Sequence, residues 1–467
     1  MLVVPQAYAL DVFRTDLAVP PVIAGNMLAS ESSQTICVFG AVGKPLNLTE
    51  AIERALCNNP KTREAWATIK IQTAGVGLAK AAYLPTLSGT LQDIRDSSRT
   101  TISNFPALSS QQSASVLSGS VTLSWVLYDF GGRSAALNNA AALLAAAQAS
   151  HEAALQDTFM NAAKDFYAAQ AAYGNLLAAH DIEQAAQDSF KAASARVDKG
   201  VAPISDQLQA QTVYAQAVFA RTKAEGDWQI ALGTLMSDLD LDPNLPINLP
   251  DASEGVTTLA EFKQSLDELI LDAKQTHPNV RAAQAQLRAA QEKVKQVAAE
   301  GLPTVSMTGK YGGNNQPVSP SLGESGLPAR ANDRYIGVQM TVPIFEGFGR
   351  TYQVRQAEAQ VELARATLEE ARQKVGLEVW SSDHALRTAT ENIGNSATLL
   401  DIAQRSYDAS LHRYLAGVGN ILELLNSQSA LASARKQRVQ ALTDWRTARL
   451  QLASTLGKLG MWNIAQP

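Results

Sequence analysis

The chain has 467 residues, with 39 Lys and Arg against 44 Asp and Glu, which gives a formal net charge of −5. The length exceeds that of one ordinary domain, and the acidic balance argues against nucleic acid as a partner. No run approaches the ~18 to 20 apolar residues that a membrane-crossing helix needs, so the sequence excludes a helical membrane protein.

The N-terminal part carries two signs of export. Residues 1–9 end in Ala-Tyr-Ala, the small-x-small pattern of a signal-peptidase site. We interpret them as the remnant of a signal peptide, with a chance match as the alternative. Cys37 and Cys57 are the two cysteines of the chain, and no metal-ligand spacing surrounds them. A periplasmic disulfide is therefore favoured over a zinc site or two free thiols.

A repeat of 217 to 218 residues organises the rest of the chain. The segment that begins at Leu48 recurs at Leu266, a shift of 218, and the segment that begins at Tyr128 recurs at Phe345, a shift of 217. Because this spacing persists over a long stretch, duplication is the simplest explanation. The predicted parts are an N-terminal segment (10–47), repeat 1 (48–237), a linker (238–265), repeat 2 (266–458) and a C-terminal tail (459–467).

Each repeat is predicted to open with a helix, over 48–83 and 266–300. A Leu-Pro pair ends each one, since proline disfavours helix in the residue before it. Strand pairs follow at about 86–128 and 304–344, with polar loops expected between the strands of each pair. The expected loops span 97–115 and 312–333.

The strands alternate with a period of two, apolar residues on one face and Ser, Thr, Gln and Lys on the other. This is typical of a membrane β-barrel, and a soluble half-buried sheet is the alternative. Four strands cannot close, and unpaired strand edges are costly in lipid, so other copies must supply partners. Three copies would supply 12 strands around an open lumen, whereas two would supply eight, which side chains would largely fill.

Long helices are predicted after the strands, over 131–199 and 348–416, each on the order of 100 Å at ~1.5 Å per residue. Each turns and returns as a second helix, to about 236 and 456, which makes two antiparallel helical hairpins. Leucines and valines, filled out with alanines, are expected to form their coiled-coil seams: Leu208, Val213 and Val218 in the first, and Leu422, Leu425 and Leu431 in the second. Aromatic residues at the strand-to-helix junctions predict a membrane-interface belt: Tyr128, Phe130, Phe345 and Phe348.

These features resemble the TolC family of outer membrane factors, from about Cys37 to Gly460. The resemblance rests on the Leu-Pro before each strand pair, the Tyr-Asp-Phe-Gly-Gly-Arg and Phe-Glu-Gly-Phe-Gly-Arg openings of the long helices, and Gly-Val at both hairpin tips. It implies a mostly α fold with membrane β: a homotrimer whose 12-stranded β-barrel, in outer membrane lipid, is continuous with a periplasmic α-helical barrel. The linker and the chain termini would form an equatorial belt.

The resemblance also implies partners and cargo. The partners are a periplasmic adaptor (membrane fusion) protein and an inner-membrane pump of the ABC, RND or MFS type. The cargo is proteins, by type I secretion, or small toxic compounds. The Cys-Asn-Asn-Pro segment at 57–60 is similar to that of members associated with type I protein secretion.

Two sets of residues are candidates for function at the hairpin tips. The tips can meet a partner end-on, so we expect the adaptor to dock on Arg196, Gly200, Val201, Arg413, Gly417 and Val418. For the glycines, a simple turn at positive φ is an equal alternative. Asp206 and Glu423 occupy matching places just past the tips, where a trimer would gather six carboxylates into a periplasmic gate that attracts cations. The alternative is helix capping, because Asn420-x-x-Glu423 fits a capping box.

The sequence offers no catalytic, cofactor or metal constellation. Its five histidines fall on predicted helices or at a helix boundary, without the spacing of a zinc site. An enzyme is therefore not expected. A periplasmic coiled-coil adaptor or structural protein without a pore is the alternative function, but such an adaptor has one hairpin and no lipid-facing strands.

Overall fold

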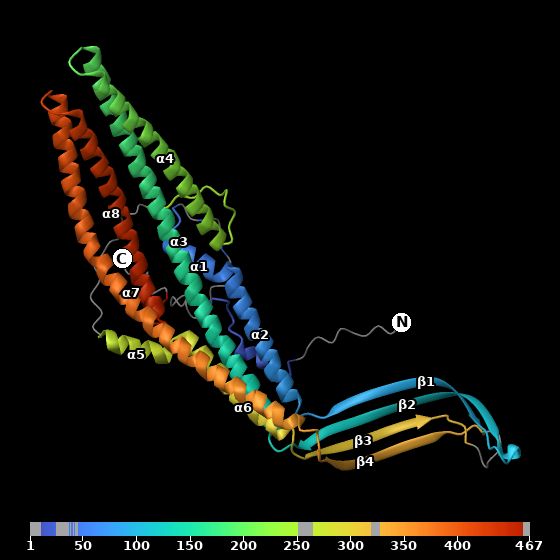
Figure 1. Cartoon of the computed structure of the whole chain (residues 1–467). Helices are drawn as coiled ribbons and strands as arrows, with labels where there is room; N and C mark the ends of the chain where they lie inside the picture. The colour runs from blue at the N-terminus through green and yellow to red at the C-terminus, as the bar shows by residue number, and fades with distance from the viewer. Residues whose placement is uncertain are drawn as a thin grey trace. The chain divides into compact units, whose positions relative to one another are not determined.

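A computed structural model of the chain describes residues 11–24, 37, 39, 40, 42, 45–250, 265–318 and 327–460. The chain is mostly helical, with one four-stranded sheet (Figure 1). The signal-peptide remnant predicted at 1–9 lies outside the described residues, as does half of the predicted linker, 251–264. Over the described part of the chain, no helix is both long enough and apolar enough to cross a membrane.

The helices of the two halves match in order and in length. Helices α1 (Leu48–Asn58) and α5 (Leu266–Thr276) have 11 residues each, and α2 (Pro60–Ala81) and α6 (Pro278–Ala299) have 22. Helices α3 (Gly132–Asp198) and α7 (Gly349–Leu415) have 67 each, and α4 (Ile204–Asp238) and α8 (Ile421–Thr455) have 35. The predicted duplication is thereby confirmed in the structure.

The first helix of each repeat is interrupted, so the prediction of single helices over 48–83 and 266–300 was wrong. Helix α1 ends at Asn58 and α2 begins at Pro60, while Asn59 between them has an extended backbone with φ −60° and ψ 131°. Pro278 follows the same pattern after α5. Proline disfavours helical geometry in the residue before it and suits the first position of a new helix. In each repeat, the proline therefore ends one helix and begins the next.

The sheet is an antiparallel meander in the order β1-β2-β3-β4, which leaves β1 and β4 as its edges. Its strands are β1 (Thr86–Thr100), β2 (Ser110–Tyr128), β3 (Thr304–Asn314) and β4 (Ala331–Thr341). The loop expected from 97 is shorter than predicted because β1 continues to Thr100 and β2 begins at Ser110. Strand β4 ends two residues before Pro343, which has no N–H to donate to a ladder.

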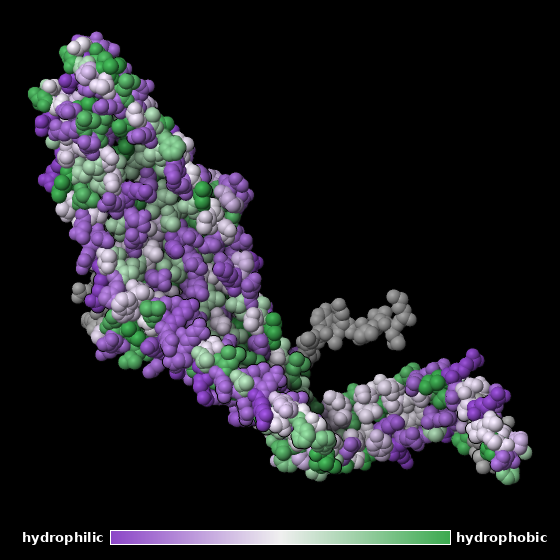
Figure 2. Space-filling model, viewed as in Figure 1, coloured by the Kyte–Doolittle hydropathy of each residue, from purple (hydrophilic) through white to green (hydrophobic). Residues whose placement is uncertain are grey.

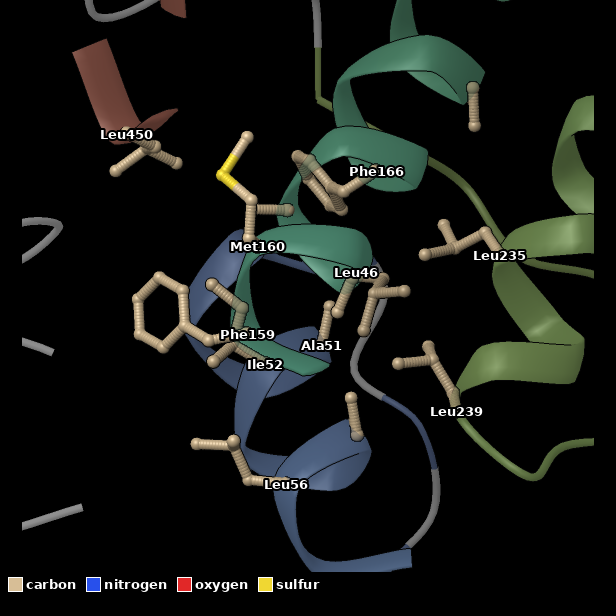
Figure 3. Close-up of a cluster of buried hydrophobic side chains, with 14 of the residues drawn as sticks. Leu46, Ala51, Ile52, Leu56, Phe159, Met160, Phe166, Leu235, Leu239 and Leu450 are labelled. Carbon is tan, nitrogen blue, oxygen red and sulfur yellow. The ribbon is translucent and has the colours of Figure 1, made fainter. Parts of the chain in front are cut away.

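The described residues form two compact units. One comprises 11–18, 71–145 and 285–366 and contains the whole sheet; the other comprises the described residues of 19–70, 146–284 and 367–460. The second unit has a large apolar core built by α1, α3 and α4 (Figure 3). Ile52, Phe159 and Leu235 are each fully buried there.

A disulfide joins the N-terminal segment to this core, as predicted. Cys37 and Cys57 are bonded, with a Cα–Cα distance of 5.6 Å, and Cys57 is 3% exposed on α1. The chain-entropy model gives a stabilisation of roughly 3 kcal/mol at most for a loop of this length.

The predicted seams were only partly right. Leu425 and Leu431 of α8 are buried, but Leu208 and Leu422 are 55% and 48% exposed. The predicted alanine filling is seen on α4, whose buried stripe includes Ala210 and Ala217, seven residues apart and therefore on one helix face. Small alanines allow the helices to approach closely, so the larger leucines on other faces are left exposed.

Candidate functional site

The predicted aromatic belt forms two ring pairs at the strand-to-helix turns. Tyr128 and Phe130 lie 4.8 Å apart between ring centroids, and Phe345 and Phe348 lie 5.5 Å apart, both edge to face. All four rings are exposed, between 44% and 74%. Phe130 and Phe348 have φ of 51° and 63°, a left-handed conformation that is strained for a bulky residue. Neighbouring contacts must therefore hold these turns in place.

In the first repeat, Arg133 makes those contacts. The Asp129 carboxylate accepts hydrogen bonds from the Arg133 backbone N–H at 2.7 Å and from its Nε at 3.1 Å. Arg133 Nη1 donates to the Val126 carbonyl at 2.7 Å, and its guanidinium lies 4.8 Å from the centre of the Tyr83 ring. One side chain thus ties the last strand residues to the first turn of α3.

In the second repeat, Arg350 occupies the equivalent position with a different set of partners. Its Nε donates to Glu346 at 3.0 Å, and its Nη1 donates to Glu300 at 2.9 Å and to the Val297 carbonyl at 3.2 Å. The sequence identified this Asp/Glu–Arg pair as a repeated motif but assigned it no role. Its i, i+4 spacing was the signal that could have revealed the ion pair.

At the first tip, α3 ends in a turn that glycine makes possible. Gly200 has φ of 68°. Val201 N donates to the carbonyl of Arg196, five residues earlier, at 3.0 Å, which is the hydrogen bond of a Schellman motif. No atom lies within 4 Å of a Cβ placed on Gly200, so its φ alone demands glycine. The turn leaves Val201 64% exposed.

The second tip repeats this turn with one addition. Gly417 has φ of 80°, Val418 N donates to the Arg413 carbonyl at 3.1 Å, and Val418 is 73% exposed. A Cβ on Gly419 would lie 2.7 Å from Tyr414 N and 2.8 Å from Arg413 C. Gly419 is therefore needed for the close approach of two backbone segments.

The two tips are joined through Arg196, whose partners were not predicted. Its Nη1 donates to the Tyr414 carbonyl at 2.8 Å, and its guanidinium lies 4.8 Å from the centre of the Tyr414 ring. Tyr414 is 2% exposed and packs in an apolar cluster that includes Ala193 and Ala210 from the first hairpin and Leu424 from the second. The Arg196 guanidinium therefore holds one hairpin to the other.

One of the predicted gate acids, Glu423, lies beside an arginine. Glu423 Oε1 is 3.3 Å from Arg413 Nη1. Asp206 is half-buried at the first tip. Burial of Tyr414 raises the pKa of its hydroxyl; the positive charge of Arg196 opposes this rise, and the negative charge of Asp206 adds to it. Glu423 thus has a compensating cation at its own tip, while Asp206 and Arg196 both act on Tyr414.

The expected capping box at the second tip is replaced by other contacts. Asn420 Oδ1 accepts from Leu422 N at 2.9 Å, while Glu423 pairs with Arg413. At the first tip the N-cap is Pro203, whose side chain makes no capping hydrogen bond. Asp206, in the first turn of α4, can still interact favourably with the helix dipole, but neither acid takes part in a side-chain cap.

A pair of carboxyl groups that the sequence did not reveal lies at the base of the first hairpin. Asp165 of α3 and Asp238 of α4 are both half-buried. Burial, followed by a hydrogen bond and charge repulsion from Asp238, raises the pKa of Asp165 to about 7. The two residues are 73 positions apart in the chain, so no local pattern could have paired them.

Comparisons with known proteins agree with this architecture. The family model described as "Outer membrane efflux protein" matches residues 51–239 and 269–458, one segment for each repeat. Protein CyaE of Bordetella pertussis is 33% identical over 453 residues, which cover 97% of this chain and 92% of that protein. Outer membrane protein TolC of Escherichia coli is 23% identical over 435 residues, covering 90% and 84%. The structure of the Campylobacter jejuni CmeC outer membrane channel matches with a TM-score of 0.77 at 16% identity, covering 96% of each chain.

Proposed function

The chain belongs to the outer membrane efflux protein family, and we propose that three copies of it close a single 12-stranded barrel, four strands from each. The protein is an outer membrane export channel that extends into the periplasm, and its family consists of transporters rather than enzymes. Channels of this family work with periplasmic adaptors and inner-membrane pumps. The finer proposals concern assembly, the tips and the cargo.

One observation carries the barrel: among the described residues, the sheet has one apolar face, and its edges β1 and β4 pair with no further strand. The register aligns Leu87, Leu123, Gly309 and Ile336 across all four strands, and directly opposed residues point to the same face. The adjoining row, Ser88, Thr122, Lys310 and Tyr335, lies on the other face. In lipid, the edges β1 and β4 need partners, and identical copies supply them.

A pair of matched substitutions tests the barrel. Val338→Asp places a charge on the apolar face, whereas Thr308→Asp, on the adjoining strand β3, places it on the polar face. We expect Val338→Asp to reduce the heat-resistant trimer in outer membrane fractions, because a charge facing lipid is destabilising, and Thr308→Asp to preserve it. A monomer for the wild type, or equal losses for both variants, would contradict the barrel.

We propose that the exposed valines of the tips, Val201 and Val418, dock the adaptor. Their support is exposure at matching turns of the two hairpins, with the neighbouring Arg196 and Arg413 held in place within the chain. Replacing both valines with Asp should abolish export while leaving trimers and bilayer conductance unchanged. Normal export by the double variant would remove the tips from the docking surface.

The cargo is a protein or a small toxic compound, delivered by an ABC, RND or MFS-type pump. Expression in cells that lack their own channel separates the two classes. Restored secretion of a protein toxin without restored resistance to dyes and detergents would assign the protein to type I secretion. The reverse result would assign it to efflux.

A further inference from the structure

Beyond the apolar rows of the sheet, the same face carries arginines. Leu87 and Leu91 of β1 are followed on that face by Arg95 and Arg99, because side chains two residues apart point the same way. The pairing of β1 with β2 runs without a bulge from Thr86 to Thr100, so this alternation is not interrupted. Both arginines are exposed.

The opposite edge of the sheet shows the same change from apolar to basic. On β4, the outward residues Ile336, Val338 and Met340 give way to Arg334 toward the loop end of the strand. Arg334 pairs across the ladder with Tyr311, which is 66% exposed on the same face. Tyrosine is enriched where a membrane meets water, so the pair suits the boundary of the apolar residues on β3 and β4. In Figure 2, hydrophobic and hydrophilic residues both lie on the visible surface of the strands.

The two faces of the sheet differ in charge at this end. The apolar-side face carries Arg95, Arg99 and Arg334 against Asp93, a net charge of +2 for the charged residues of its strands. The other face carries Lys310 against Asp96 and Asp333, a net charge of −1. Asp93 accepts a hydrogen bond from Ser115 Oγ at 3.0 Å. Within the described part of the chain, none of the three arginines forms an ion pair.

We propose that these arginines form a band that binds the phosphate groups of phosphorylated lipids, with the acyl chains of those lipids on the apolar rows below. The inference rests on the proposed function, which places the apolar face in lipid. Guanidinium is planar and binds phosphate through two parallel hydrogen bonds, and basic residues beside a membrane attract anionic headgroups. Because β1 and β4 are the two edges of the sheet, pairing between copies would place the strand that carries Arg95 and Arg99 in one copy next to the strand that carries Arg334 in the next.

The test counts lipids on the intact protein. Purified full-length trimer in phosphatidylcholine nanodiscs receives a few mole per cent of diphosphoryl lipid A, and native mass spectrometry counts the lipid A that each trimer retains. We expect Arg95→Gln with Arg99→Gln and Arg334→Gln to weaken this binding at least tenfold. Lys310→Gln, which removes a cation from the other face, is the matched control and should bind like the wild type. Monophosphoryl lipid A should bind more weakly than the diphosphoryl form.

The outcomes are separable. Equal retention of lipid A by the wild type and the triple variant would overturn the proposal. So would displacement of the lipid by millimolar inorganic phosphate, since the arginines would then bind phosphate rather than a lipid at the membrane boundary. The heat-resistant gel band and bilayer conductance of each variant report folding and channel formation independently. A wild type without either would refute the channel, whereas a conducting wild type that ignores lipid A would refute only the arginine band.

Discussion

Glycines at the two hairpin tips are required for different physical reasons. Gly200 and Gly417 have positive φ and open space around them, so only their backbone conformation excludes other residues. Gly419 has no such φ, but its hydrogen atoms face the backbone of Arg413 and Tyr414. The sequence shows three similar glycines, and the structure distinguishes them.

The first prediction follows from the contact at Gly419. Gly419→Ala should lower stability by about 1–3 kcal/mol, because a methyl group there must displace backbone atoms. Gly394→Ala, in the exposed middle of α7 with nothing within 4 Å, is the control and should stabilise the helix by about 0.5–1 kcal/mol. Thermal unfolding of both variants measures the difference. Equal melting temperatures would mean that the second tip relaxes freely around the methyl group.

The second prediction concerns pH and the carboxyl pair. The pKa of Asp165 lies at about 7 instead of the ordinary 3.8, so between these values the folded chain holds a proton that the unfolded chain has released. Stability should therefore fall as pH rises through this window and level off above it. Asp165→Asn removes the titration, so its melting temperature should exceed that of the wild type at pH 8 by more than at pH 5. Asp198→Asn, exposed at the end of the same helix, should shift both temperatures alike.

At the scale of elements, the turn from strand to helix is built twice with similar parts. An acid and an arginine four residues apart pair at each turn, Asp129 with Arg133 and Glu346 with Arg350. Both arginines also donate to backbone carbonyls, but Arg350 recruits Glu300 as well, while Arg133 contacts the Tyr83 ring. Duplication preserved the pairing but not the partners.

The third prediction tests the first of these turns. Arg133→Gln should cost about 1–3 kcal/mol, since hydrogen bonds to charged groups are strong and the side chain of Arg133 is only 15% exposed. Arg355→Gln, on the surface of α7 near the equivalent turn, is the control and should cost little. The temperature at which trimers dissociate on gels reports the loss. If trimers of the Arg133→Gln variant dissociate at the same temperature as those of the control, the turn does not depend on this arginine.

Local patterns predicted some elements well and others poorly. The long helices were predicted to within one residue at each end, since Gly200 and Gly417 terminate them in the sequence itself. The same proline rule that was applied at Leu-Pro was not applied at Pro60 and Pro278, so two breaks were missed. The contact of Arg196 with Tyr414 joins residues 218 apart, and no local pattern encodes it.

At the scale of the whole molecule, the periplasmic mouth predicted at the tips would carry basic as well as acidic side chains. Each copy contributes Glu423 with Arg413 beside it, and Asp206 and Arg196, which both act on Tyr414. A trimer would thus gather six guanidiniums near the six carboxylates of the predicted gate. The acids alone do not set the field at the entrance; the arginines beside them do so as well.

The last prediction separates these contributions in planar bilayers, where the reversal potential in a salt gradient measures ion selectivity. Arg413 and Glu423 are 57% and 42% exposed, so their pair contributes little to stability, and either partner can be neutralised without loss of trimers. Arg413→Gln should increase cation selectivity, because it leaves Glu423 without its compensating charge. Asp206→Asn with Glu423→Gln should lower it, and Arg413→Gln with Glu423→Gln should return it close to the wild-type value. The control for position is Arg405→Gln, which leaves Asp401 unpaired within α7, away from the tip. If position at the tip matters, this variant should change ion selectivity less than Arg413→Gln.

Equal effects of Arg405→Gln and Arg413→Gln would instead assign selectivity to the charge of the whole helical barrel, and the tip acids would lose their special role in the gate.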